Sequence, residues 1–228
     1  MNLDDAISSF LNSFVGKSYT VDEILTELLS GPMLTGAAYL SVVWFLWFKN
    51  SDARDRVRLL IGVATAVAAA LLGLALQLSL PFHARPLYDA ALHLKWASRI
   101  GPGTLSHRSS FPSDHATIWF GLATVIFLHH RKIGAVAFVW TAILCACRVA
   151  LGFHYASDIA GSAALGIIAV ALSQRIPVTV RASTLLTLIL EQRQAAFYLA
   201  AFLMSYELSV FFADFQEIVE MLMHKRIA

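Results

Sequence analysis

Apolar stretches long enough to cross a lipid bilayer recur along the chain, and they constrain its fold more than any other feature. A spanning helix needs roughly 20 mostly apolar residues. Only 14% of the 228 residues are charged, against about 25% in a typical soluble domain. We therefore predict an all-α integral membrane bundle that forms a single domain over residues 1–228. Its six transmembrane helices are predicted at about 32–48, 57–80, 114–130, 133–151, 157–173 and 195–213.

Residues 1–31 precede the first predicted span and carry apolar residues at helical spacing. This pattern predicts one or two short amphipathic helices. Such helices lie at the membrane surface or pack against the bundle, and periodicity does not separate the two arrangements. The longest polar connection, residues 81–113, joins the second and third spans. Loops of this length commonly carry function or short helices, and the apolar residues between Tyr88 and Arg99 predict a short helix there.

Lysine and arginine residues in the loops predict the orientation of the spans, because cytoplasmic loops are enriched in them. The loops after the first, third and fifth spans carry nine basic residues, and the opposite side carries eight. Three of those eight, Arg85, Arg108 and Arg148, have a possible chemical role, and setting them aside leaves nine against five. We therefore expect both termini and the 81–113 loop outside the cytoplasm. The net charge of +2 is too small to predict nucleic-acid binding.

A polar motif opens the third predicted span at residues 110–115, with the sequence Ser-Phe-Pro-Ser-Asp-His. Ser and Asp favour helix N-caps, and Pro favours the first helical turn. A helix N-terminus presents free N–H groups and the positive end of the helix dipole, which bind phosphate. His115 would lie in the first turn, close to such a phosphate. A capping sequence with an incidental histidine is the alternative, and a motif this short does not decide between them.

A second polar cluster comprises Arg148, His154 and Asp158, at the junction of the fourth and fifth spans. An arginine at the centre of a spanning helix costs about 3 kcal/mol, and less near an interface, so Arg148 should face a cavity or a partner. His154 and Asp158 share a face if both lie on one helix. The carboxylate would then accept from Nδ1–H and leave the other ring nitrogen as nucleophile or base. The alternative is a pair that only caps the fifth span.

A third segment places Arg85 before Pro86, just after the second span. Alone, Arg85 would be an interfacial anchor. Together the three segments resemble the PAP2 superfamily (type 2 phosphatidic acid phosphatases) of membrane lipid phosphatases. The pattern of that family is Lys-x6-Arg-Pro, then Pro-Ser-Gly-His, then Ser-Arg-x5-His-x3-Asp. This chain departs from it at three positions, with Leu78 for Lys, Asp114 for Gly and Cys147 for Ser.

The resemblance implies a phosphatase that uses no metal ion and no other cofactor. His154 would attack phosphorus and form a phosphohistidine, held in register by Asp158. His115 would protonate the leaving oxygen and then activate water. The residues expected to bind the substrate phosphate are Arg85, Ser113, Asp114 and Arg148. The loss of the lysine at Leu78 removes one cation, and the candidates to replace it are Gln77, His83, Lys95 and Arg108.

The sequence thus predicts a phosphatase of membrane lipids that acts at the outer face of a bacterial inner membrane. Undecaprenyl diphosphate is the first substrate expected, and phosphatidic acid, phosphatidylglycerol phosphate and lipid A are the alternatives. A transporter lined by intramembrane charges is one rival, but the gathering of the polar motifs at one membrane face argues against it. A catalytically inactive lipid-binding protein is the other, suggested by Leu78. Two acids in the last span, Glu207 and Asp214, are not assigned to the site.

Overall fold

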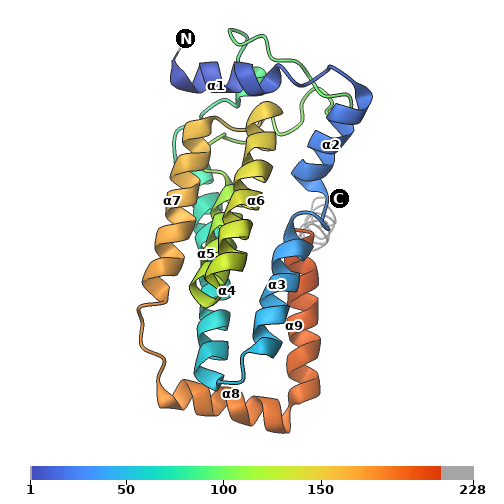
Figure 1. Ribbon diagram of the computed structural model, residues 1–228. Helices are drawn as coiled ribbons and strands as arrows, with labels where there is room; N and C mark the ends of the chain where they lie inside the picture. Colours follow the sequence, from blue (N-terminus) through green and yellow to red (C-terminus); the bar gives the residue numbers. More distant parts are fainter. Residues whose placement is uncertain (1, 212–228) are drawn as a thin grey trace, which may run out of the picture. The chain divides into compact units, whose positions relative to one another are not determined.

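The computed structural model describes residues 2–211, and the regular secondary structure in this range consists of helices (Figure 1). The chain separates into two compact units. The first unit joins the residues up to Gly31 with Arg58–Pro177, and the second joins Pro32–Val57 with the chain from Val178 onward. The elements are α1 (Leu3–Asn12), α2 (Tyr19–Ser30), α3 (Gly36–Lys49), α4 (Ala53–Ser79), the 3-10 turn η1 (Pro86–Tyr88), α5 (Asp114–His129), α6 (Arg131–Ala150), α7 (Ala156–Ser173), α8 (Val180–Gln192) and α9 (Gln194–Ser209).

Each of the six predicted spans corresponds to a helix, namely α3, α4, α5, α6, α7 and α9. Within the described residues, α4, α6 and α7 are long and apolar enough to cross a membrane. Helix α3 has 14 residues, and α5 and α9 have 16 each, which is short of the roughly 20 that a full span needs. The expected all-α fold is therefore confirmed for the described residues, with three helices that could span a membrane, whereas six spans of full length are not confirmed. Asp214, at the end of the last predicted span, lies outside the described residues.

Helix α5 forms the centre of the first unit and packs against α6 on one side and α7 on the other. Its side chains are buried along nearly its whole length. Gly166 of α7 allows the close approach, because a Cβ atom there would lie 2.1 Å from the carbonyl oxygen of Thr117 in α5. Large apolar side chains that face outward from this unit, among them Leu71, Val139 and Ile168, suit contact with lipid tails.

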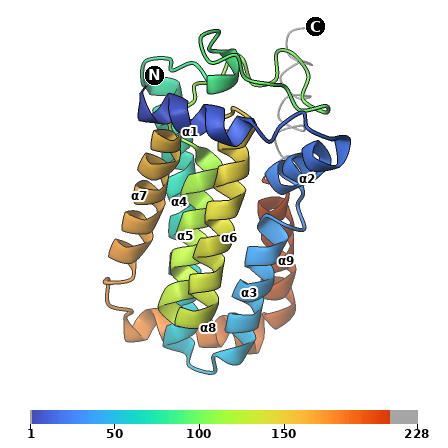
Figure 2. The same cartoon turned by 45° about the horizontal axis from the view of Figure 1, so that its top comes forward.

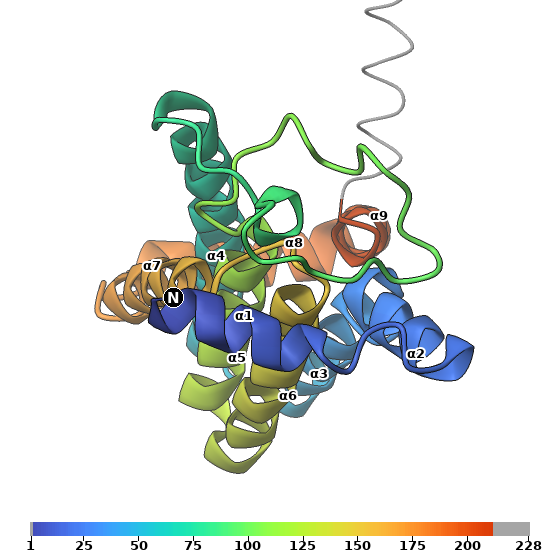
Figure 3. The same cartoon turned by 90° about the horizontal axis from the view of Figure 1, so that it is seen from above.

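Helix α1 runs crosswise over the ends of α6 and α7 (Figures 2 and 3). The Asn12 side-chain amide donates to the carbonyl oxygens of Lys95 and Ala150, at 3.0 and 2.8 Å. The Asp4 carboxylate accepts from the Ser157 N–H at 2.9 Å and so caps the start of α7. The two expected N-terminal helices are thus present, and α1 is packed against the bundle, which is the second of the two arrangements considered.

The connection over residues 81–113 is a wide loop that contains η1 and a series of turns (Figure 3). The prediction of a short helix between residues 88 and 99 is wrong. Backbone N–H groups in this segment donate to side chains of the N-terminal segment instead of to a helical neighbour. Lys95 N–H donates to Asn12 Oδ1 at 2.7 Å, and Ser98 N–H donates to Asp22 Oδ2 at 2.9 Å. These side chains fix the loop in a non-helical path.

The second unit is built on the pairing of α3 with α9. Trp44 donates its indole N–H to the Ser205 hydroxyl at 3.1 Å, and Trp47 donates to the Tyr198 hydroxyl at 3.2 Å. Buried indole N–H groups need such partners. Helix α8 has no counterpart among the predicted segments. Glu207, one of the two unassigned acids, lies on α9 in this unit.

Candidate active site

The polar motifs meet at one end of the first unit. Arg85 lies after α4, Ser113 and His115 open α5, Arg148 ends α6, and His154 lies in the turn before α7. The turn depends on Gly152, whose φ of +72° belongs to the left-handed region that favours glycine. The Gly152 carbonyl oxygen accepts from the Leu87 N–H of η1 at 2.9 Å. The α6–α7 turn is thereby docked on η1, which brings His154 beside Arg85.

Arg85 is almost fully buried, with 4% of its surface exposed. Its guanidinium donates to three main-chain carbonyl oxygens, those of Phe153 (2.8 Å), Ser109 (3.2 Å) and Arg108 (3.2 Å). Its Nη1 also lies 3.5 Å from Nε2 of His154. Burial lowers the pKa of Arg85 to about 10, so the side chain stays charged near neutral pH. The site therefore holds a fixed cation next to a histidine nitrogen.

His154 is held with its two ring nitrogens in distinct roles. Nδ1 lies 2.7 Å from the carbonyl oxygen of Ser110. A carbonyl oxygen only accepts, so Nδ1 carries the proton and Nε2 keeps its lone pair. Burial, together with the charges of Arg85 and Arg148, holds the pKa of His154 well below its usual value. The imidazole is therefore neutral near pH 7, with Nε2 available as a nucleophile.

Asp158 does not make the expected hydrogen bond to Nδ1 of His154. Helix α7 begins at Ala156, so His154 precedes the helix and the four-residue spacing does not place the two side chains on one face. The Asp158 carboxylate accepts instead from the Tyr155 N–H at 2.8 Å and from the Ser110 hydroxyl. Ser110 joins the two groups, because its hydroxyl binds Asp158 while its carbonyl oxygen binds His154.

The N-terminus of α5 has fewer open N–H groups than the sequence suggested. The Ser113 N–H donates to the Ser162 hydroxyl at 2.7 Å, and the His115 N–H donates to the Asp114 carboxylate at 2.8 Å. The Ala116 N–H is capped by the Ser113 hydroxyl at 3.3 Å, as predicted for an N-cap serine. The Asp114 carboxylate, expected at the substrate phosphate, is bound to His115. Three N–H groups expected to bind phosphate thus have acceptors within the protein.

Arg148 is buried in the last turn of α6 and has the protein partner that its position demanded. Its Nη2 donates to the carbonyl oxygen of Leu29, in the last turn of α2, at 2.9 Å. The C-terminal carbonyl groups of a helix carry partial negative charge, so this contact suits a cation. Arg148 also acts electrostatically on His154, which brings it into the same site.

Leu78, at the position of the missing lysine, is 80% exposed. Its neighbour Gln77 is buried and donates to the carbonyl oxygens of Ser109 and Pro112, at 2.8 and 3.4 Å. Gln77 thus ties the end of α4 to the motif loop. Two other candidate replacements, Lys95 and Arg108, have exposed side chains.

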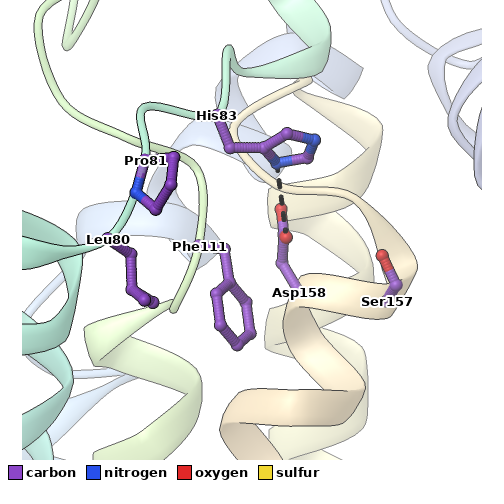
Figure 4. Close-up of a pocket in the computed structure, with 6 residues that line it drawn as sticks. All are labelled: Leu80, Pro81, His83, Phe111, Ser157 and Asp158. Carbon is purple, nitrogen blue, oxygen red and sulfur yellow. Dashed lines mark ion pairs between the residues drawn. The ribbon is translucent and has the colours of Figure 1, made fainter.

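His83 lies beside Asp158, across a hollow of about 370 Å³. Figure 4 shows its imidazole directed at the carboxylate, with 3.8 Å between Nδ1 of His83 and Oδ1 of Asp158. The remaining lining is mainly apolar and consists of Leu80, Pro81, Phe111 and Ser157. Of the candidates for the missing cation, His83 is the one that reaches the Asp158–Ser110–His154 chain.

Ser110, Gln77 and Ser162 together connect the motif segments. Sequence reasoning assigned no role to Ser110 or Ser162, and it considered Gln77 only as a replacement for the missing lysine. Ser110 and Ser162 are fully buried, and Gln77 is nearly so. Their contacts run largely to main-chain atoms, and a main-chain acceptor leaves no trace in residue identity. Burial of a polar residue beside a motif is the one signal that could have identified them.

Residues 80–182 match the family model of the PAP2 superfamily, and this range contains Arg85, His115, Arg148, His154 and Asp158. Over this range, which is somewhat less than half of the chain, the protein is similar to the phosphatases of this superfamily.

Three curated relatives align with most of the chain. The bacitracin transport permease protein BcrC of Bacillus licheniformis is 27% identical over 161 residues, which cover 70% of this chain and 73% of the relative. The putative undecaprenyl-diphosphatase YbjG of Escherichia coli is 29% identical over 147 residues, 63% of this chain and 68% of the relative. The undecaprenyl-diphosphatase BcrC of Bacillus subtilis is 26% identical over 150 residues, 65% and 70%. No solved structure gives a significant match.

Ser110 connects Asp158 to His154, and we call this connection the Ser110 bridge. It predicts that Ser110 and Asp158 act on His154 through one contact. Ser110→Ala and Asp158→Asn should each lower kcat about tenfold, because a hydrogen bond to a charged group contributes about 1.5–3 kcal/mol. The double variant should be no slower than the slower single variant, since Asp158→Asn removes the charge and Ser110→Ala removes the donor of the same contact. Phosphate release by the four proteins of this cycle, with thermal melting as a check on folding, is the measurement.

Ser157→Ala is the matched control, because Ser157 lines the same hollow but its hydrogen bond to Asp4 uses the backbone N–H. It should keep wild-type kcat. If the losses in Ser110→Ala and Asp158→Asn multiply in the double variant, the two residues act independently and the bridge has no role.

Proposed function

We propose that the protein hydrolyses a lipid-linked diphosphate through a phosphohistidine intermediate. Undecaprenyl diphosphate is the substrate that we expect it to prefer. The observation that carries this proposal is the state of His154, a buried neutral imidazole with Nδ1–H bound to Ser110 and Nε2 turned to Arg85. A nucleophile needs this arrangement of lone pair and adjacent cation. The names of two relatives, which are undecaprenyl-diphosphatases, supply the choice of lipid.

In the first step, Nε2 of His154 attacks the terminal phosphorus and forms a P–N bond. The bond from phosphorus to the bridging oxygen breaks, and His115 gives its proton to that oxygen, which leaves as the lipid monophosphate. Arg85 and Arg148 offset the negative charge that shifts on the phosphoryl oxygens. The Ser113 hydroxyl, in the first turn of α5, is the third group assigned to hold the phosphate.

In the second step, water attacks the phosphohistidine. His115, now deprotonated, accepts a proton from the water as the new P–O bond forms and the P–N bond breaks. Inorganic phosphate leaves and His154 returns to its neutral form. Asp158 keeps the imidazole in register through Ser110, because its carboxylate fixes the serine whose carbonyl oxygen holds Nδ1–H.

The distribution of basic loop residues supports an active site at the outer face of a bacterial inner membrane. A transporter is the second candidate, since one relative is named a bacitracin transport permease protein. A transport pathway requires polar groups at successive depths of the membrane. The residues of this site gather instead at one end of the first unit, where α5 and α7 begin and α6 ends. This arrangement favours catalysis at the membrane surface.

The substrate is tested by phosphate release from a panel of lipids, with the full chain purified in detergent. We expect the highest kcat/KM for undecaprenyl diphosphate, and lower values for phosphatidic acid, phosphatidylglycerol phosphate and lipid A. Activity should persist in millimolar EDTA, because no step uses a metal ion. A higher kcat/KM for a glycerolipid phosphate would transfer the assignment to that lipid, and loss of all activity in EDTA would overturn the proposed mechanism.

A further inference from the structure

Asp114 and His115 are neighbours in the chain. The backbone N–H and the ring nitrogen Nδ1 of His115 both contact the Asp114 carboxylate. Oδ1 of Asp114 lies 2.8 Å from the His115 N–H and 2.7 Å from Nδ1 of its ring. An ionised carboxylate only accepts hydrogen bonds. Nδ1 of His115 therefore carries a proton, and the ring is fixed in the tautomer that leaves proton transfer to Nε2.

The Asp114–His115 pair is partly exposed and lies among charged groups. The side chains of His115 and Asp114 are 24% and 21% exposed, whereas His154 is buried. The charged and titratable groups that act on the pair are Arg85 of the motif loop, Arg148 of α6 and His154 of the α6–α7 turn. Two of these are fixed cations, and Asp114 is the anion that faces them.

This carboxylate stands where the family pattern Pro-Ser-Gly-His has glycine, which has no side chain to hold the ring. The chain thus provides its proposed general acid with an orienting group that the pattern lacks. A phosphate-binding role for Asp114 is disfavoured, because like charges repel and the carboxylate is already engaged with His115.

We propose that Asp114 is a positioning residue that fixes the tautomer and orientation of His115 for proton transfer to the leaving oxygen. The inference rests on the proposed function, because it assigns to His115 the role of general acid and base. The alternative is a purely structural role for Asp114. A carboxylate in the first turn of α5 stabilises the helix through its dipole and accepts one backbone N–H, without an effect on the rate of the reaction.

Two substitutions separate these roles. Asp114→Asn keeps a side-chain oxygen that can cap α5, because Asn caps helices as well as Asp does, but it removes the charge. Asp114→Gly restores the family pattern and removes both. If Asp114 positions His115, both variants should lower kcat about tenfold, with KM changed less than about threefold. The alkaline limb of the kcat–pH profile should move about one unit to lower pH, because a carboxylate favours the protonated imidazole.

Asp5→Asn is the matched control. Asp5 is also a first-turn carboxylate that accepts a backbone N–H, that of Asn2 in α1, and it has no histidine beside it. Its variant should keep the wild-type kcat and pH profile. Thermal melting of all four proteins checks that the bundle is intact.

A readout independent of turnover is the ¹⁵N NMR spectrum of protein labelled at histidine, with the His115 signals assigned by their loss in His115→Asn. At a pH above the alkaline limb, where the ring has lost its second proton, the wild type should show the neutral Nδ1–H tautomer of His115, and Asp114→Gly should show a mixture of tautomers. Wild-type pH profiles and an unchanged tautomer in both variants would overturn the inference. Those outcomes differ from failure of the proposed function, in which the unmodified protein releases no phosphate from any lipid of the panel.

Discussion

Replacing His154 by asparagine is expected to reduce phosphate release about 10³-fold or more, as loss of a nucleophile does in other hydrolases. The asparagine amide can still donate to the Ser110 carbonyl oxygen, as Nδ1 of His154 does at 2.7 Å. It has no lone-pair nitrogen at the position of Nε2. The loss would therefore come from the missing nucleophile and not from a disturbed turn. The measurement is kcat and KM for phosphate release in detergent.

Labelled substrate sharpens this experiment, since a phosphohistidine survives an alkaline quench. Wild-type protein should retain label and His154→Asn should retain none. His130→Asn is the control, because His130 only caps α6 by accepting from the Ile133 N–H and Asn serves equally well there. Label on the His154→Asn protein, or activity near wild type, would contradict the assignment of the nucleophile.

Replacing Arg85 by lysine should lower kcat/KM about 10²–10³-fold, the usual effect of removing one preorganised donor to a developing negative charge. Lysine keeps the charge but lacks the planar fork that binds Phe153, Ser109 and Arg108 at once. The cation would no longer be fixed beside Nε2 of His154. Steady-state kinetics with the preferred lipid, together with the melting temperature, measures both consequences.

Arg99→Lys is the matched control in the same loop. Arg99 is exposed and pairs with Glu23 at 3.0 Å on the surface, and such pairs contribute little. It should keep both activity and stability. An Arg85→Lys protein with wild-type kcat/KM would show that a mobile charge suffices, and that the fixed geometry of Arg85 is not needed for catalysis.

The positions of the helices were predictable because apolar periodicity and helix length are coupled. All six apolar stretches became helices, but their ends were set by caps that the hydropathy pattern does not contain. Helix α8 was missed because three Ser and Thr residues and Arg181 interrupt its apolar positions. Its start depends on the Thr179 hydroxyl, which accepts from the Ala182 N–H at 3.2 Å. A single cap of this kind is weak evidence in a sequence.

The site was predictable in its residue types and less so in its connections. The motifs came together in one unit as expected, since each lies at a helix end on the same side. The spacing of His154 and Asp158 led to a wrong prediction of a direct hydrogen bond between them. A four-residue spacing places side chains on one face only inside a continuous helix, and the chain turns at Gly152, before α7 begins. The Ser110 carbonyl could not be foreseen, because every residue has one.

Apart from the contact of Arg85 with Nε2 of His154, the guanidinium hydrogen bonds given for Arg85 and Arg148 within the described residues run to main-chain carbonyl oxygens. A carbonyl oxygen carries only a partial charge, so each contact fixes the geometry of the cation without neutralising it. In the proposed mechanism, an arriving phosphate therefore has no hydrogen-bonded carboxylate to displace from these guanidinium groups. The attraction of two fixed charges is available to the substrate from its first encounter, and capture of the headgroup requires no exchange of ion-pair partners.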